Sequence, residues 1–126
     1  MNVALRKPMT LEHFLAWYRA HKLDHTYVYA GVFEALAALR PMPDGGGVRS
    51  MAVLTNKPIG PSVAICEALE LSRHFFCIYG GDSFETKKPD PKGLLRLMEE
   101  AGARPEETLM VGDSDVDLLT AQRAGA

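Results

Sequence analysis

The sequence lacks a long hydrophobic run, an excess of either charge, and any cysteine pattern typical of secreted or zinc-binding proteins. No apolar run approaches the ~20 residues of a membrane span, and the first ten residues hold no continuous apolar segment of a signal peptide. The balance of 14 basic and 16 acidic residues predicts no nucleic-acid partner and no membrane partner. Cys66 and Cys77 form no CxxC pair, so we expect reduced thiols and a cytoplasmic protein.

What the sequence does contain is an alternation of apolar strand-like runs and helical patterns. Its 126 residues, 47% apolar and 24% charged, suit one soluble α/β domain. Alternation between residues 51 and 124 predicts a parallel sheet with helices on its faces and right-handed crossovers. We expect strands over 51–55, 75–80 and 108–112, and helices over 10–22, 32–40, 61–71, 91–101 and 116–124.

A polar cluster follows each expected strand, where open parallel sheets bind their ligands. Thr55 and Asn56 end the first strand before a helix, and a hydroxyl, backbone N–H groups and a helix N-terminus together can hold a phosphate. These residue types also suit a simple turn and helix cap. Lys87 and Lys88 precede Pro89, which restricts the backbone and so the position of an ammonium group that can neutralise a phosphoryl group. A solvated charged loop is the alternative for such a pair.

The third cluster is the acidic run that begins at Asp113. Asp113 follows an apolar strand directly, and Asp117 lies four residues further on, in the following helix. Carboxylate oxygens suit Mg²⁺, which takes one or two protein carboxylates together with water and phosphate. A helix N-cap with acidic neighbours is the competing explanation. Three aspartates exceed what a cap requires, so we expect a Mg²⁺ site.

Taken in order, VLTNKP, KKPDP and VGDSDVD resemble three motifs of the haloacid dehalogenase-like superfamily, and most closely its phosphoglycolate phosphatase group. The resemblance implies a Rossmann-like core that hydrolyses a small phosphate monoester through an aspartyl-phosphate, with Mg²⁺ as cofactor. It implies that Thr55 and Asn56 bind the phosphoryl group and that Lys88 bridges it to the nucleophile, with Lys87 as the fallback. Asp113 would bind the metal, and Asp117 would support the metal or the lysine.

One motif that the resemblance implies is missing from these residues. The family carries a DxD motif on a first, central strand, whereas the one DxD here is Asp113-Ser114-Asp115, part of the third motif. We therefore expect residues 1–26 to be the remnant of a helical cap and residues 27–126 a partial core that lacks its central strand. Strands 51–55 and 108–112 would then pair directly or leave backbone groups unpaired.

Several functions remain open on these residues. The first expectation is phosphoglycolate phosphatase activity in a longer parent, with the 126-residue chain itself inactive and a fragment of that parent. A sugar-phosphate mutase of the same superfamily is one alternative, and a non-catalytic phosphate-binding fragment is another. His21 and His25 stand four residues apart, but Lys22 occupies the place of the glutamate in HExxH, so we expect ordinary surface there rather than a zinc site.

Overall fold

The computed structural model describes residues 10–13, 16, 20 and 26–126. Residues 11–13, 16 and 20 are helical, as predicted for 10–22. His21 and His25 lie outside the described residues, and the predicted boundary between cap remnant and core at residue 26 lies at their border. The described helices and strands are α2 (Val32–Leu39), β1 (Ala52–Leu54), α3 (Ile59–Ala68), β2 (Cys77–Tyr79), α4 (Lys92–Ala101) and α5 (Asp115–Ala124), with 3₁₀ turns at Ser72–His74 and Pro105–Glu107.

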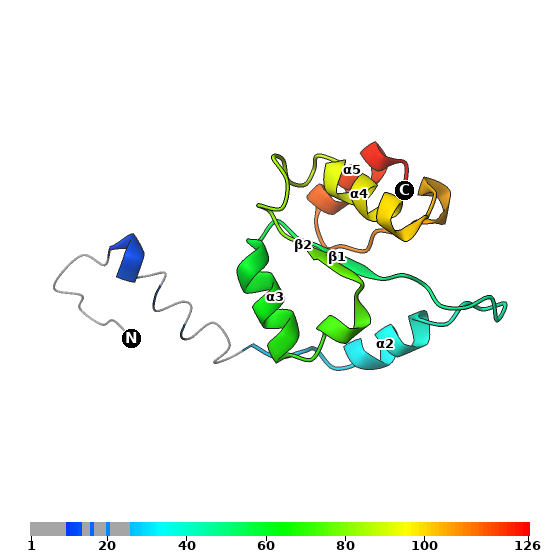
Figure 1. Ribbon diagram of the computed structural model, residues 1–126, viewed down its shortest axis with the longest axis horizontal. Helices are drawn as coiled ribbons and strands as arrows, with labels where there is room; N and C mark the ends of the chain where they lie inside the picture. Colours follow the sequence, from blue (N-terminus) through cyan, green and yellow to red (C-terminus); the bar gives the residue numbers. More distant parts are fainter. Residues whose placement is uncertain (1–9, 14–15, 17–19, 21–25) are drawn as a thin grey trace.

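Strands β1 and β2 form the parallel sheet that the sequence predicts. Ala52 pairs with Cys77 and Leu54 with Tyr79, and α3 forms the crossover between them. Both strands come from short apolar runs, which is typical of strands covered on both faces. In Figure 1, α4 and α5 lie on one side of the two strands and α2 and α3 on the other. The α/β class and its layered arrangement are therefore confirmed.

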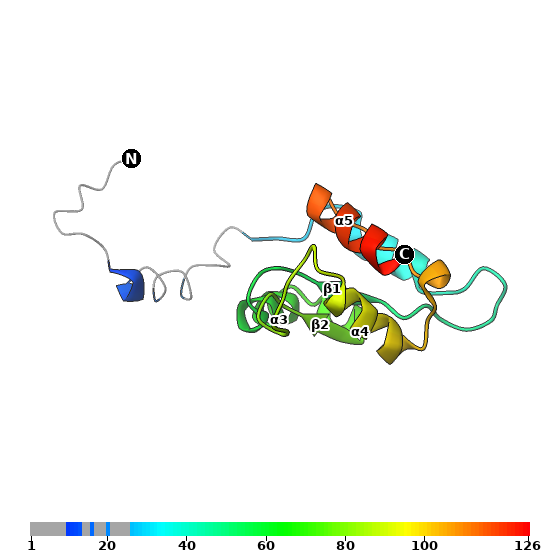
Figure 2. The ribbon, with the colours of Figure 1, turned by 90° about the horizontal axis from the view of Figure 1, so that it is seen from above.

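A small core joins α4, α5 and β1. Leu94 and Met98 of α4 and Ala124 of α5 are buried together, and Leu54 and Met110 pack against them. The apolar positions of α4 fall on one face at helical spacing, which gives the helix a single stripe to bury. In Figure 2, seen from above, α5 runs alongside α4, and the two helices contact each other. This packing holds the last turn of α5 against α4 and the end of β1.

The helix boundaries follow from capping contacts. The helix expected from Pro61 begins two residues earlier, at Ile59, because the Asp82 carboxylate accepts a hydrogen bond of 2.8 Å from the Ile59 N–H. At the start of α4, Asp90 accepts one of 2.9 Å from the Lys92 N–H. Gly102 ends α4 with φ of 65°, a left-handed conformation that favours glycine.

The prediction of a third strand over residues 108–112 is wrong. The segment forms no strand, and the side chains of Leu109 and Val111 are 84% and 83% exposed, whereas Met110 packs on the core. A strand requires a neighbouring backbone, and among the described residues no backbone hydrogen bond joins this segment to β1. The sequence predicted that residues 51–55 and 108–112 either pair directly or leave backbone groups unpaired, and in the structure they are unpaired.

The outer edge of β1 is also without a backbone partner among the described residues. Met51 accepts from the Phe76 N–H at 2.9 Å, and the Thr55 N–H donates to Tyr79 at 3.0 Å, so these residues face β2. Backbone groups alternate in direction along a strand, and Ala52 and Leu54 therefore direct theirs to the opposite edge. No helix in the part of the chain that the structure describes is both long and apolar enough to cross a bilayer.

Candidate functional site

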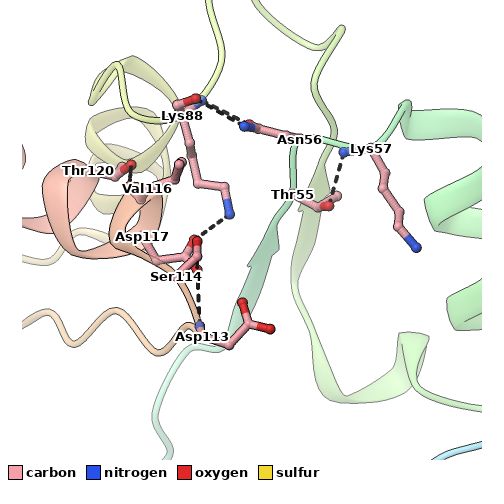
Figure 3. Close-up of polar contacts among 9 residues, drawn as sticks. All are labelled: Thr55, Asn56, Lys57, Lys88, Asp113, Ser114, Val116, Asp117 and Thr120. Atoms are coloured by element: carbon pink, nitrogen blue, oxygen red, sulfur yellow. Dashed lines mark hydrogen bonds and ion pairs between the residues drawn. The ribbon is translucent and has the colours of Figure 1, made fainter.

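The centre of the candidate site is an ion pair between Lys88 and Asp117. The Lys88 Nζ lies 2.6 Å from Asp117 Oδ1, and the two side chains are only 12% and 11% exposed. Lys88 comes from the loop after β2, while Asp117 is the third residue of α5. Figure 3 shows the lysine side chain extending from its loop toward the first turn of α5. Two segments that are far apart in sequence are thus joined by a largely buried charged contact.

Asp117 also organises the start of its own helix. Its Oδ2 accepts hydrogen bonds from the Asp113 N–H and the Ser114 hydroxyl, both at 3.2 Å. Lys88 lowers the pKa of the Asp117 carboxyl from its usual range by its hydrogen bond and charge, Ser114 and Asp113 lower it further, and burial opposes them. The carboxylate is therefore ionised at neutral pH and acts as an anchor for the lysine.

Asn56 holds the lysine's backbone in position. Its side-chain Nδ2 donates to the Lys88 carbonyl at 3.0 Å, and its Oδ1 accepts from the Lys88 N–H at 2.9 Å. This two-point contact joins the end of β1 to the loop after β2, as Figure 3 shows, and the peptide bond between Lys88 and Pro89 is cis. The sequence predicted Asn56 as a phosphate-binding residue; in the structure its side-chain amide is engaged with the Lys88 backbone.

Thr55 and Asp113 face the same space as the Lys88 ammonium. The Thr55 hydroxyl accepts a hydrogen bond of 3.1 Å from the Lys57 N–H, which forms a tight turn directly after β1. In Figure 3, the carboxylate of Asp113 points into the space between the end of β1 and the first turn of α5, whereas the Lys57 side chain points away. The structure therefore brings Thr55, Lys88 and Asp113 together at the carboxyl end of the sheet.

Lys87 differs from its neighbour. The ammonium of Lys88 reaches Asp117, whereas Lys87 takes part in none of the ion pairs found among the described residues. A cavity of about 10 Å³ borders both lysines and Thr55, which is room for about one water molecule. The side chain of Lys88, and not that of Lys87, therefore lies at the centre of the candidate site.

The donor set suits a hard cation that keeps most of its water ligands. Among the described residues there is no group of three His, Cys, Asp or Glu side chains that could enclose a metal. The Asp113 carboxylate is exposed and accepts no hydrogen bond from the described residues, while Asp117 is committed to Lys88. Mg²⁺ needs only one or two protein carboxylates and takes the rest of its ligands from water and phosphate, so Asp113 fits that role.

Gly112 permits the close approach of Asp113 to α5. A Cβ atom at position 112 would collide with the carboxylate group of Asp117, so only glycine fits while Asp117 keeps its place. Sequence reasoning gave Gly112 no role, although its position directly before Asp113 was a usable signal. It also missed Asp82, whose capping of α3 from 23 residues away leaves no local sign.

Comparison with known proteins shows the family of the chain. The family model of haloacid dehalogenase-like hydrolases matches residues 1–126. The chain belongs to the haloacid dehalogenase-like hydrolase family. Among curated proteins, it is 40% identical over 115 residues to a phosphoglycolate phosphatase of Rhodospirillum rubrum, which covers 91% of this chain and 46% of that protein. It is 43% identical over 100 residues to phosphoglycolate phosphatase 1 of Pseudomonas aeruginosa, covering 79% and 35%.

Solved structures resemble the chain in overall fold. A predicted phosphoglycolate phosphatase from Haemophilus somnus superposes with a TM-score of 0.76 at 31% identity, over 94% of this chain and 54% of that one. A protein named as a candidate beta-phosphoglucomutase from Thermotoga maritima gives a TM-score of 0.79 at 25% identity, over 97% and 56%. The chain spans about half the length of the haloacid dehalogenase-like relatives that it matches.

The Lys88–Asp117 pair predicts a specific acid response. The pKa of Asp117 lies below its usual range, and an unfolded aspartate titrates at ~3.9. The stabilisation is therefore present above about pH 4 and is lost as the pH falls through the native pKa. We expect Asp117→Asn to be less stable than the parent chain at pH 7, with a difference that shrinks as the pH falls below about 4. Urea unfolding followed by circular dichroism at several pH values measures this; a constant difference down to pH 2 would contradict the assignment.

Proposed function

We propose that these residues form the phosphate- and Mg²⁺-binding half of an enzyme that hydrolyses a small phosphate monoester. The observation that carries the proposal is the convergence of Thr55, Lys88 and Asp113 at one edge of the sheet (Figure 3). Names of the relatives favour phosphoglycolate as the substrate. With reduced thiols at Cys66 and Cys77, we place the reaction in the cytoplasm.

The proposed division of labour follows from the contacts. The Lys88 ammonium, held by Asp117 and by Asn56, faces the phosphoryl oxygens and offsets their charge. The Thr55 hydroxyl and the N–H groups of the turn after β1 donate hydrogen bonds to the same oxygens. Asp113 holds Mg²⁺, which when bound shields the phosphoryl charge and orients the group. Each of these groups binds or orients; none of them is placed as a covalent nucleophile.

We therefore expect the 126-residue chain to bind phosphate in a Mg²⁺-dependent manner and to release no product. Hydrolysis of phosphate monoesters needs accelerations of up to ~10²¹, whereas one preorganised electrostatic group contributes ~10²–10³. An assay with p-nitrophenyl phosphate and Mg²⁺ should give the rate of the buffer alone. Turnover that disappears in Asp113→Asn would refute this expectation, since it would require a nucleophile within these residues.

A chimera tests the function of the longer protein. Residues 27–126 would replace the matching segment of the Rhodospirillum rubrum relative, which supplies the remaining half. We expect the chimera to release inorganic phosphate from phosphoglycolate, and the same chimera with Lys88→Met to lose this activity. A folded chimera that binds Mg²⁺ and phosphate but hydrolyses no phosphate monoester would reject the proposal.

A mutase is the second candidate, because one of the matching structures is named as a candidate beta-phosphoglucomutase. The same groups would hold the phosphoryl group in both reactions, so the outcome is decided by the product. Incubating the chimera with β-glucose 1-phosphate separates them. Phosphate retained on an isomerised sugar favours the mutase, whereas free phosphate favours the hydrolase.

A further inference from the structure

A second hollow lies at the opposite end of the sheet from the candidate site. Its walls include Met51, which precedes β1, and Phe76, which precedes β2, so it sits at the amino ends of the two strands. Its volume is about 220 Å³, well above the ~10–15 Å³ that one water molecule needs and just below the ~300–1,000 Å³ of pockets for drug-sized ligands. The space suits a small organic molecule.

Three arginines give this hollow its charge. Arg40 at the end of α2, Arg49 before β1 and Arg73 in the 3₁₀ turn before β2 all line it, and no acidic side chain does. None of the three takes part in an ion pair found in the described part of the chain. A concave surface with clustered, unpaired guanidinium groups attracts anions and offers them planar, two-point hydrogen bonding.

One of these arginines is already fixed in place. The Arg49 Nη1 donates to the carbonyls of Leu39 and Pro41, at 2.8 and 3.1 Å, which ties the segment before β1 to the end of α2. Arg40 and Arg73 remain exposed. The hollow therefore combines one held guanidinium with two that are free to close on a ligand.

The polar groups beside the arginines lack partners. His74 lines the hollow, while its Nε2 and the hydroxyl of Ser72, which precedes Arg73, are buried without a hydrogen-bond partner in the described structure. The imidazole ring lies against Phe33, with ring centroids 5.9 Å apart. Because these two atoms are buried, the arginines are the groups that a ligand in the hollow would contact.

From this combination we propose that the hollow binds a small organic polyanion whose phosphate or carboxylate groups contact Arg40 and Arg73. The apolar side chains of Met51 and Phe75 on the same wall would contact the carbon skeleton of such a ligand. This site is separate from Thr55, Lys88 and Asp113, which lie at the other end of the strands. The proposal does not depend on the function proposed for that end.

Titration with citrate in Mg²⁺-free buffer of low ionic strength tests the proposal. Calorimetry should show one binding site, and amide NMR shifts should fall on residues 48–51 and 73–76. In Arg40→Ala/Arg73→Ala the affinity should fall at least about tenfold, corresponding to about 1.4 kcal/mol. Inorganic phosphate in parallel distinguishes the two anion chemistries: binding at the same amides extends the site to phosphate, and binding of citrate alone restricts it to carboxylates.

A matched control separates a site from general charge attraction. Arg96→Ala/Arg104→Ala removes the same charge from arginines that pair with Glu100 and Glu107, away from the hollow, and should change the affinity by less than about twofold. Lys87→Met, at an exposed lysine outside the hollow, should leave citrate binding unchanged. Equal losses in both double variants, or shifts confined to residues near Thr55 and Asp113, would overturn the proposal. All four arginines are exposed, so neither double variant should unfold the chain.

Discussion

Replacing Lys88 by methionine should abolish Mg²⁺-dependent phosphate binding and lower the free energy of unfolding by about 2 kcal/mol. Methionine keeps the length and apolar stem of lysine but removes the charge. Asp117 is then a largely buried carboxylate whose 2.6 Å partner is gone, and a hydrogen bond to a charged group contributes ~1.5–3 kcal/mol. Calorimetry with phosphate and Mg²⁺ measures binding, and urea unfolding measures stability.

The control for this substitution is the neighbouring lysine. Lys87→Met makes the same chemical change at an exposed residue that forms no ion pair among the described residues. It should leave both phosphate affinity and stability within experimental error of the parent chain. If Lys87→Met lost phosphate binding while Lys88→Met retained it, the lysine assignment would be reversed and the ion pair with Asp117 would have a purely structural role.

Thr55 and Lys88 could be predicted from sequence because they lie in the segments that follow two parallel strands, whose carboxyl ends meet at one edge of the sheet. Asp113 lies at the same edge because it stands just before the first turn of α5, although residues 108–112, from which its position was predicted, form no strand. What could not be predicted was the pairing within the cluster. The choice between metal and lysine as the partner of Asp117 depends on side-chain direction, which local sequence does not encode.

The failure of the third strand has a different cause. Residues 108–112 have the apolar composition of a buried strand, but a strand exists only with a neighbour to bond, and its stability comes mainly from such contacts. Ala52 and Leu54 direct their backbone groups away from β2 and are unpaired among the described residues, and residues 108–112 do not pair with them. Apolar composition alone therefore does not make a strand.

The exposed side chains of residues 108–112 also show that this segment is not packed as a strand. Leu109 and Val111, more than four-fifths exposed, would each gain ~1.5–3 kcal/mol from full burial, so the segment contributes little to stability in its present state. The buried part of the chain instead depends on the packing of α4 and α5 against Leu54 and on the ion pair of Asp117 with Lys88, which joins α5 to the loop after β2. Substitutions at that junction should therefore have larger effects than substitutions along 108–111.

Gly112→Ala tests the contacts of Asp117 at the start of α5 most directly. The added Cβ would collide with the carboxylate group and with the Cβ of Asp117, so turning the side chain is not enough: the backbone must shift, and Asp117 gives up its contacts with Lys88, Asp113 and Ser114. We expect the free energy of unfolding to fall by about 2–3 kcal/mol, since several hydrogen bonds to a charged group are lost together, and phosphate binding to weaken at least about tenfold.

Gly60→Ala provides the comparison for this last substitution. Gly60 lies in α3, its φ is not positive, and a Cβ there would meet nothing within 4 Å. Gly60 lies in the first turn of α3 and directly before Pro61, which restricts a residue with a Cβ and offsets the ~0.5–1 kcal/mol by which alanine is favoured over glycine inside a helix, so this variant should stay close to the parent in stability. A Gly112→Ala variant as stable as Gly60→Ala would mean that Asp117 can relax without loss. The Lys88–Asp117 pair would then not be what holds the first turn of α5 at the end of β1.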